Sequence, residues 1–348
     1  MLPKSATFSP DAEVGTTVPA VLDELEKAGS ESQPHLLWAF RPFPRGGFSL
    51  AFARVRFIRD IHAEKEATEK PTISFEFFPF KTPEGEATFF GKTLPALMSA
   101  KPDYASVTYG AGGSTREKTL DIVEQIQTDF SLTTMAHLTC IKHTQTEIDA
   151  ILDEANNRGI QNILALRGDS PPEEDWSQTE GGFEFASELV SHIRGRGDFG
   201  VAVAGFPEGH IDCSEGREAD WQHLVRKISC GADMVITQMF FDNADYFQLA
   251  DYLREAGVKA PLFPGIIPVA NAGQIKKFSA MCGARLPDAF AARLDELGDD
   301  AEAVREYGIE YATAQCRELL DRGAPGLHFY TLNKSRAVLR ILGNLGLA

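Results

Sequence analysis

A single carboxylate in an aromatic, β-prone segment is the first candidate for chemistry. Residues 72–78 carry Glu76 between phenylalanines, and the period-two alternation of a strand would put Ile73, Phe75 and Phe77 on one face and Glu76 on the other. The apolar face should contact helices, so Glu76 should point into the interior of a barrel near its mouth. Burial there would favour the neutral acid, the form that donates a proton in general acid catalysis. The alternative is a structural carboxylate paired with a lysine or arginine.

A second carboxylate, Asp169, follows a predicted strand through Arg167 and Gly168. At that position it could stabilise a cation bound at the strand end. An internal ion pair with Arg167 explains the same adjacent charges, because opposite charges in a loop commonly pair with each other. The sequence leaves both interpretations of Asp169 open.

Two glycine-rich segments lie in different contexts. Residues 110–115 end one predicted strand and open a helix, so they could offer backbone N–H groups to an anion or form a capped tight turn. Residues 195–200 match the dinucleotide-binding pattern G-x-G-x-x-G, but they end a helix and precede a strand. A true dinucleotide fingerprint follows a strand and begins a helix. We therefore interpret residues 195–200 as a helix-terminating turn.

His137, Cys140 and His143 have the spacing of metal ligands. They straddle the end of a predicted strand, and no clear fourth ligand accompanies them. We predict no metal site. Nothing in the chain resembles a phosphate-binding Walker loop, and its serine and cysteine residues lack the nucleophile-elbow pattern.

Eight β-rich runs alternate with amphipathic stretches from Pro71 onward. The predicted strands are residues 72–78, 103–109, 133–139, 162–167, 199–205, 233–239, 261–266 and 325–331. The predicted helices are residues 84–99, 115–129, 145–158, 182–194, 217–229 and 243–256, with a multiplied helical region at 271–322 that breaks near Gly283 and Gly298. This alternation favours an α/β fold, a closed (β/α)8 TIM barrel, over an open doubly wound sheet. The active sites of such barrels lie at the carboxyl ends of the strands.

The barrel should occupy residues 71–348 and carry an N-terminal extension, residues 1–70. The run from Gln33 to Arg59 contains five arginines and no acidic residue. It could be an anion-binding arm. A helical or partly disordered segment that packs against the acidic body is the simpler interpretation.

The composition excludes several classes of protein. The chain of 348 residues has a formal net charge of −16, which would repel nucleic acids and anionic membranes. Its five scattered cysteines lack the paired spacing of a disulfide framework. No apolar run approaches the roughly 20 residues of a membrane span, and the N-terminus lacks a secretory pattern. We expect a cytoplasmic protein that binds neither nucleic acid nor membrane.

Six strand-end motifs occur in the order found in methylenetetrahydrofolate reductases, and the chain resembles this family over residues 71–346. The motifs are residues 74–79, 107–111, 137–140, 165–169, 236–238 and 328–333. The resemblance implies that FAD lies across the barrel mouth without a Rossmann domain. It further implies that a hydride passes from NADH through FAD to 5,10-methylenetetrahydrofolate, which becomes 5-methyltetrahydrofolate, by a ping-pong mechanism.

The resemblance also assigns roles to individual residues. Glu76 resembles the acid that protonates folate N10 and opens the ring to an iminium ion. Asp169 matches the carboxylate that stabilises this cation and tunes the flavin. Gln238 matches a residue shared by folate and nicotinamide, Phe278 the aromatic on which either ligand stacks, and Gln274 a second folate contact.

Fourteen positions correspond to those at which the family contacts FAD. They are Thr108, Tyr109, Ala111, His137, Arg167, Gly168, Asp169, Ala186, Phe206, His210, Asp220, His223, Arg226 and Lys227. Arg226 and Lys227 would help to neutralise the pyrophosphate. Three positions depart from the family pattern: Phe206 stands where some members carry tyrosine, His223 where some have asparagine, and Lys334, a predicted folate contact, where arginine is found. Lys334 keeps the positive charge but loses the bidentate fork, which Arg336 could supply instead.

Other functions share much of this pattern. The chain could be another FAD barrel oxidoreductase similar to proline dehydrogenase, a family member reduced by a partner protein, or a noncatalytic folate-binding subunit. The presence of both Glu76 and Asp169 argues against the last of these. The resemblance to short bacterial members implies NADH as donor and a homo-oligomer. We expect no regulatory domain for S-adenosylmethionine.

Overall fold

The computed structural model describes residues 56–109, 116–168 and 179–348, which belong to one compact unit, Arg54–Ala348. Three predicted features lie outside the described residues. They are residues 1–55 of the extension, the glycine-rich turn 110–115 with Ala111, and Asp169. Among the described residues, no helix combines the length and the apolar character needed to cross a membrane.

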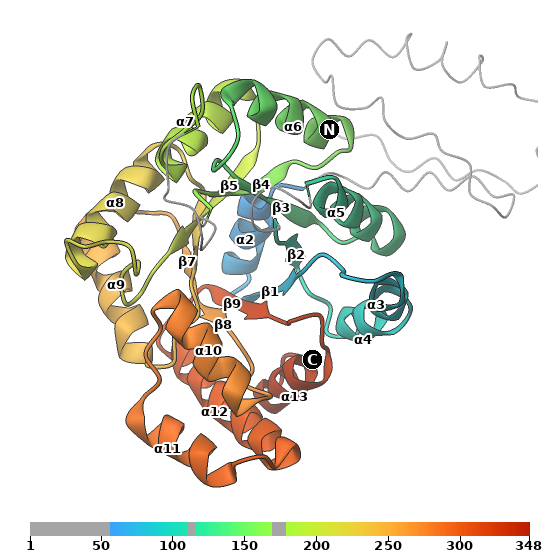
Figure 1. Ribbon diagram of the computed structural model, residues 1–348, viewed down its shortest axis with the longest axis vertical. Coiled ribbons are helices and arrows are strands. Elements are labelled where there is room, and N and C mark those ends of the chain that lie inside the picture. Colours follow the sequence, from blue (N-terminus) through green and yellow to red (C-terminus); the bar gives the residue numbers. More distant parts are fainter. Residues whose placement is uncertain (1–55, 110–115, 169–178) are drawn as a thin grey trace, which may run out of the picture. The chain divides into compact units, whose positions relative to one another are not determined.

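Parallel strands form a ring at the centre of this unit (Figure 1). The strands are β1 (Thr72–Phe77), β2 (Tyr104–Val107), β3 (Thr134–Thr139), β4 (Asn162–Leu166), β5 (Gly200–Gly205), β6 (Met234–Thr237), β7 (Leu262–Phe263), β8 (Gly265–Ile266) and β9 (Gly326–Tyr330). Their order in the sheet is β7-β6-β5-β4-β3-β2-β1-β9-β8. The predicted α/β barrel and its strands are confirmed.

One predicted strand, residues 261–266, is divided at Pro264 into β7 and β8. β7 pairs with β6, and β8 pairs with β9, so the two ends of the strand order meet at adjacent residues. Pro264 has no N–H to donate, but its carbonyl accepts a hydrogen bond from His328 N at 3.0 Å. Gly265 is required by close approach, because a Cβ there would lie 2.2 Å from the carbonyl oxygen of Thr237. The divided strand therefore closes the barrel.

Helices surround the ring of strands (Figure 1). They are α2 (Ile58–Glu66), α3 (Pro83–Thr88), the π-helical turn η1 (Phe89–Thr93), α4 (Leu94–Met98), α5 (Arg116–Phe130), α6 (Gln145–Asn157), α7 (Ala186–Arg196), α8 (Arg217–Ser229), α9 (Asn243–Glu255), α10 (Ala272–Cys282), α11 (Asp288–Leu297), α12 (Ala301–Asp321) and α13 (Arg336–Leu345). The predicted breaks are confirmed, since Gly283 ends α10 with a φ of 73° and Gly298 ends α11. The glycine-rich segment 195–200 runs from the end of α7 into β5, as predicted.

The two faces of each strand bury different sets of residues. Ile73, Phe75 and Phe77 of β1 join the large core between strands and helices, as their alternation predicts. A second cluster fills the lumen of the barrel toward its amino-terminal end. Its buried members are Ile58, Tyr104, Met135, Leu164, Ala202, Met234, Ile236 and Phe263. The lumen is therefore a packed core, and the carboxyl ends of the strands are left for polar side chains.

Helix α2 closes the amino-terminal end of the barrel. Its first residue, Ile58, is buried in the lumen cluster, and Ile58 N donates to Asn162 Oδ1 at 3.0 Å. The Arg59 guanidinium contacts Asp233 at 3.4 Å and Asp198 at 2.7 Å. The last part of the predicted extension thus contributes directly to the core of the barrel.

Candidate active site

Glu76 lies in the lumen at the carboxyl end of β1 and is only 6% exposed. Its Oε2 atom lies 3.4 Å from His137 Nε2 and 3.5 Å from His328 Nε2. Among the described residues, no lysine or arginine forms an ion pair with this carboxylate. The alternative of a structural ion pair therefore has no partner in this part of the chain.

His137 extends into the same space from β3. Burial lowers the pKa of His137 to about 4, although the negative charge of Glu76 opposes the shift. The imidazole is neutral at pH 7 and offers Glu76 no positive charge. Its Nε2 atom has no hydrogen-bond partner among the described residues, because the 3.4 Å approach to Glu76 lacks the required geometry. A buried polar atom without a partner is typical of a site that a ligand completes.

His328 on β9 is a site residue for which no sequence motif predicted a role. It is fully buried, and its Nδ1 lies 2.8 Å from Ser74 Oγ. The β1–β9 register places Ser74 opposite His328 and Glu76 opposite Tyr330. Alternation of the strand after Leu327 was the available signal, since it puts His328 on the lumen face beside Glu76.

The segment after β9 fixes the backbone around Glu76. Thr331 Oγ1 donates to Glu76 O at 2.7 Å. Asn333 exchanges two hydrogen bonds with the Phe78 backbone, at 2.9 and 2.8 Å. Asn333 and Leu332 adopt left-handed conformations with φ of 55° and 50°. Such strained residues persist where surrounding structure holds them, often at functional sites.

Arg167 and Gly168 follow β4 toward the mouth. Arg167 Nη2 pairs with Asp212 at 2.7 Å, and Arg167 Nε donates to Gly168 O at 3.3 Å. Gly168 has a φ of 91°, and a Cβ there would lie 2.4 Å from Ile141 Cγ2. Only glycine fits this position without displacing Ile141. The described partner of Arg167 is Asp212, while Asp169 lies outside the described residues.

Thr108 and Tyr109 follow β2 at the same end of the barrel. Thr108 N donates to Phe77 O at 2.9 Å, which joins this segment to the end of β1. Tyr109 Oη lies 3.1 Å from His143 Nε2. The described residues contain no group of three His, Cys, Asp or Glu side chains able to hold a metal ion. Burial raises the pKa of Cys140 to about 11, which disfavours the thiolate that metals bind.

Helix α8 and the loop before it carry several predicted FAD positions. Lys227 Nζ donates to Ala204 O at 2.6 Å, and burial lowers its pKa to about 8, opposed by the charge of Asp220. Burial raises the pKa of Asp220, with Lys227 and His210 opposing the shift. Lys227 and Asp220 thus lie in one electrostatic group near the carboxyl end of β5.

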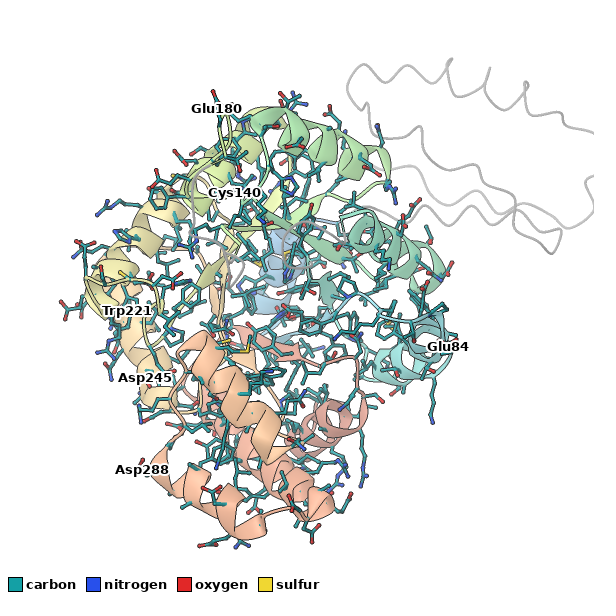
Figure 2. All side chains as sticks on the ribbon, in the orientation of Figure 1. Glu84, Cys140, Glu180, Trp221, Asp245 and Asp288 are labelled. Carbon is teal, nitrogen blue, oxygen red and sulfur yellow. The ribbon has the colours of Figure 1, made fainter. Side chains whose placement is uncertain are left out.

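Arg226 and Lys227, the two adjacent cations predicted to neutralise the pyrophosphate, differ in burial. Arg226 and His223 are exposed on α8, whereas the Lys227 ammonium is buried. Phe206 packs edge-on against His210, with ring centroids 4.5 Å apart. Figure 2 labels Trp221 of α8, whose indole N–H donates to Phe206 O at 2.9 Å and so fastens this loop to the helix.

The remaining predicted residues lie at different depths around the mouth. Gln238 follows β6, and its Oε1 accepts from Met239 N at 2.8 Å. Phe278 of α10 is half-buried against a third apolar cluster, which includes Met239 and Phe290 and also contacts Tyr330. Gln274 of α10 and Lys334 after β9 are exposed. Ala186 begins α7 and is buried.

Arg336 was predicted as a substitute for the arginine that the family carries at the position of Lys334, but it pairs with glutamates of α12. Its Nη2 pairs with Glu302 at 2.5 Å and with Glu306 at 3.8 Å, both on α12. A groove of about 750 Å³ lies in the same region, between α11, α12 and α13. It is lined by outer helices and is separate from the lumen residues around Glu76.

Comparisons with known proteins agree with the strand-end motifs. Residues 60–346 match the family described as Methylenetetrahydrofolate reductase. The chain is 40% identical over 296 residues to Methylenetetrahydrofolate reductase (NADH) 1 of Arabidopsis thaliana, covering 81% of this chain and 50% of the relative. It is 38% identical over 274 residues to the 5,10-methylenetetrahydrofolate reductase of Escherichia coli, covering 79% of this chain and 90% of the relative.

The chain spans about half the length of the plant relatives it matches. A solved structure of an uncharacterized Clostridium thermocellum protein, which binds two copies of 5-methyl-5,6,7,8-tetrahydrofolic acid, superposes with a TM-score of 0.56. That protein is 14% identical, and the match covers 82% of this chain and 96% of the other. This likeness supports the fold alone. On the evidence of its sequence matches, the chain belongs to the methylenetetrahydrofolate reductase family.

Proposed function

We propose that the chain reduces 5,10-methylenetetrahydrofolate to 5-methyltetrahydrofolate, with NADH as electron donor and FAD as bound cofactor. Family membership and the names of the relatives support the substrate and the donor. The observation that carries the proposal is Glu76, a buried carboxyl group at the strand ends without a cationic partner among the described residues. Such a group can act as a general acid.

The described residues fit a flavin dinucleotide in two respects. His137 offers a buried nitrogen without a partner among the described residues, and Lys227 offers a buried ammonium group for the phosphates. The proposed cofactor contacts are Thr108, Tyr109, Ala111, His137, Arg167, Gly168, Asp169, Ala186, Phe206, His210, Asp220, His223, Arg226 and Lys227. When bound, FAD supplies a carrier that accepts a hydride from one substrate and gives it to another.

The chain's own task is to activate and hold the folate. Glu76 gives its proton to folate N10 and becomes a carboxylate, while the opened ring becomes an iminium ion. Asp169 stabilises that cation by its negative charge. Gln238, Gln274, Phe278 and Lys334 are the proposed folate contacts, and the first and third of these also serve the nicotinamide. Because one site serves two substrates in turn, the kinetics should be ping-pong.

The experiment is a pair of anaerobic half-reactions on the purified holoenzyme. NADH should bleach the yellow flavin, and 5,10-methylenetetrahydrofolate should restore its colour. A folded but colourless protein would exclude a flavin enzyme. A yellow protein that NADH cannot bleach but a partner protein can would identify the partner-reduced alternative. Oxidation by another acceptor but not by this folate would identify a different FAD barrel. A homo-oligomer and a cytoplasmic location remain predictions.

A further inference from the structure

A chain of polar contacts runs through the lumen behind Glu76. Ser74 Oγ donates to the carbonyl oxygen of Leu327 at 3.4 Å and lies 2.8 Å from His328 Nδ1. The other ring nitrogen, His328 Nε2, lies 3.5 Å from Glu76 Oε2. Ser74 and His328 are both fully buried, so water does not compete for these contacts. The positions of the protons along this chain therefore depend on the partners alone.

The directions of the hydrogen bonds depend on the tautomer of His328. The single hydroxyl hydrogen of Ser74 has two acceptors within reach, Leu327 O at 3.4 Å and, in one tautomer, His328 Nδ1 at 2.8 Å. When this hydrogen goes to Leu327 O, which can only accept, His328 Nδ1 is the donor to Ser74 Oγ. In a neutral imidazole the other nitrogen carries the lone pair. This lone pair on Nε2 faces Glu76, and the contact is favourable when Glu76 carries a proton to donate.

The described groups that face Glu76 and His328 from neighbouring strands do not supply a positive charge. Tyr104 from β2 stacks on His328, with ring centroids 6.4 Å apart. Tyr330 from β9 donates its hydroxyl to Thr237 O at 2.6 Å. His137 from β3 is neutral. The described surroundings thus offer Glu76 an acceptor on His328 and no cation.

We propose that His328, oriented by Ser74, is a positioning residue that holds the proton on Glu76 Oε2 until the folate is bound. This inference rests on the proposed function, because the held proton is the one that N10 receives. In this role His328, which is fully buried, transfers no proton itself. Its role is to present a hydrogen-bond acceptor to Glu76, and the role of Ser74 is to select the tautomer that does so.

The test compares two serines that share burial and surroundings. Ser74 and Ser106 are both fully buried, and each lies next to Glu76 in the sheet, but only Ser74 contacts His328. In Ser74→Ala the Nδ1 donor loses its acceptor, and the tautomer with Nε2–H becomes accessible and stabilises the Glu76 carboxylate. The folate half-reaction should slow roughly tenfold at pH 7, the usual consequence of losing one buried hydrogen bond, and recover as the pH falls.

Ser106→Ala is the matched control and should keep the wild-type pH profile of the folate half-reaction. Both variants should keep the NADH half-reaction, which needs no proton from Glu76. An unchanged pH profile in Ser74→Ala, or an equal shift in Ser106→Ala, would overturn the inference. Failure of the wild-type enzyme to reduce the folate would instead remove the proposed function, and the inference with it.

A second measurement does not depend on the folding of a serine variant. Nuclear magnetic resonance of the wild-type holoenzyme with nitrogen-15-labelled histidine distinguishes the two tautomers of each ring. His328, assigned by the signal missing in His328→Gln, should show a protonated Nδ1 and an unprotonated Nε2. A proton on Nε2 would contradict the proposed role directly.

Discussion

Two carboxylates at opposite ends of the barrel differ in whether cationic side chains pair with them. Asp233, before β6 at the amino-terminal end, pairs with Arg194 at 2.6 Å and with Arg59 at 3.4 Å. It also accepts a hydrogen bond from Val201 N at 2.7 Å. Glu76, at the carboxyl end of β1, has only uncharged or titratable histidine neighbours among the described residues.

We infer from this difference that Asp233 serves the stability of the fold and Glu76 its function. A carboxylate with two guanidinium partners contributes to stability and can hardly release or take a proton. A buried carboxyl group without a cation costs stability, and it remains useful because its proton is available. This division agrees with the general rule for such barrels, in which the amino-terminal face holds the fold and the carboxyl face carries the chemistry.

The largest effect on stability is expected from Asp233→Ala. The substitution leaves Arg59, Arg194 and the Val201 N–H without their shared partner. We expect a loss of about 2–4 kcal/mol in the free energy of unfolding, reduced by the partial exposure of the pair. Urea denaturation at pH 7 measures it. The folded fraction should keep both half-reactions.

The corresponding substitution at the mouth should cost much less stability. Glu76→Gln removes no ion pair with an arginine or lysine among the described residues, so the free energy of unfolding should change by less than about 1 kcal/mol. If Glu76→Gln proves more destabilising than Asp233→Ala, the assignment of the two ends to function and stability is wrong.

A loss of stability at low pH is expected from His137, because burial lowers its pKa to about 4. The unfolded chain binds a proton below about pH 6.5, whereas the folded chain resists it. His137 therefore lowers stability as the pH falls from 6.5 to 4, by at most about 1.4 kcal/mol per pH unit. His137→Gln should flatten this part of the stability curve, measured by urea denaturation. The exposed His223→Gln serves as control, and two parallel curves for wild type and His137→Gln would contradict the neutral, buried state.

Two adjacent cations on α8 should differ in their effect on FAD binding. Lys227 is half-buried with its ammonium group enclosed near Asp220, whereas Arg226 is exposed. Lys227→Gln should weaken FAD binding about tenfold, equivalent to about 1.4 kcal/mol, because a cation in a low dielectric acts strongly on a phosphate. Arg226→Gln should weaken it by a smaller factor, because solvent screens the charge of the exposed guanidinium. Fluorescence titration of the apoprotein with FAD distinguishes the two, and an equal loss would show that burial is not what matters.

Much of the fold could be predicted because it depends on local periodicity. The alternation around Glu76 correctly gave its face of the strand, and the glycines at 283 and 298 correctly marked the ends of helices. The division of one strand at Pro264 was missed, since a proline within a short β-rich run leaves the run readable as a single strand. The role of α2 as the closure of the barrel depends on tertiary contacts that no local pattern contains.

The candidate site was predictable only in part. Motif positions brought Glu76, His137 and Gly168 to one end of the barrel. The contact of His328 with Glu76 depends on the register between β1 and β9, two strands separated by about the whole barrel sequence. The different burial of Arg226 and Lys227 depends on the rotation of α8 against β5, which a pair of adjacent positive charges does not reveal.

The most direct test of the central claim, that Glu76 supplies the proton for folate reduction, is a stopped-flow comparison of both half-reactions in Glu76→Gln. The exposed Glu84→Gln on α3, visible in Figure 2, is the control. Flavin reduction by NADH should stay close to the wild-type rate, while reoxidation by 5,10-methylenetetrahydrofolate should slow by about 10²–10⁴-fold. Equal loss of both half-reactions, or a normal rate of reoxidation by the folate, would contradict this role of Glu76.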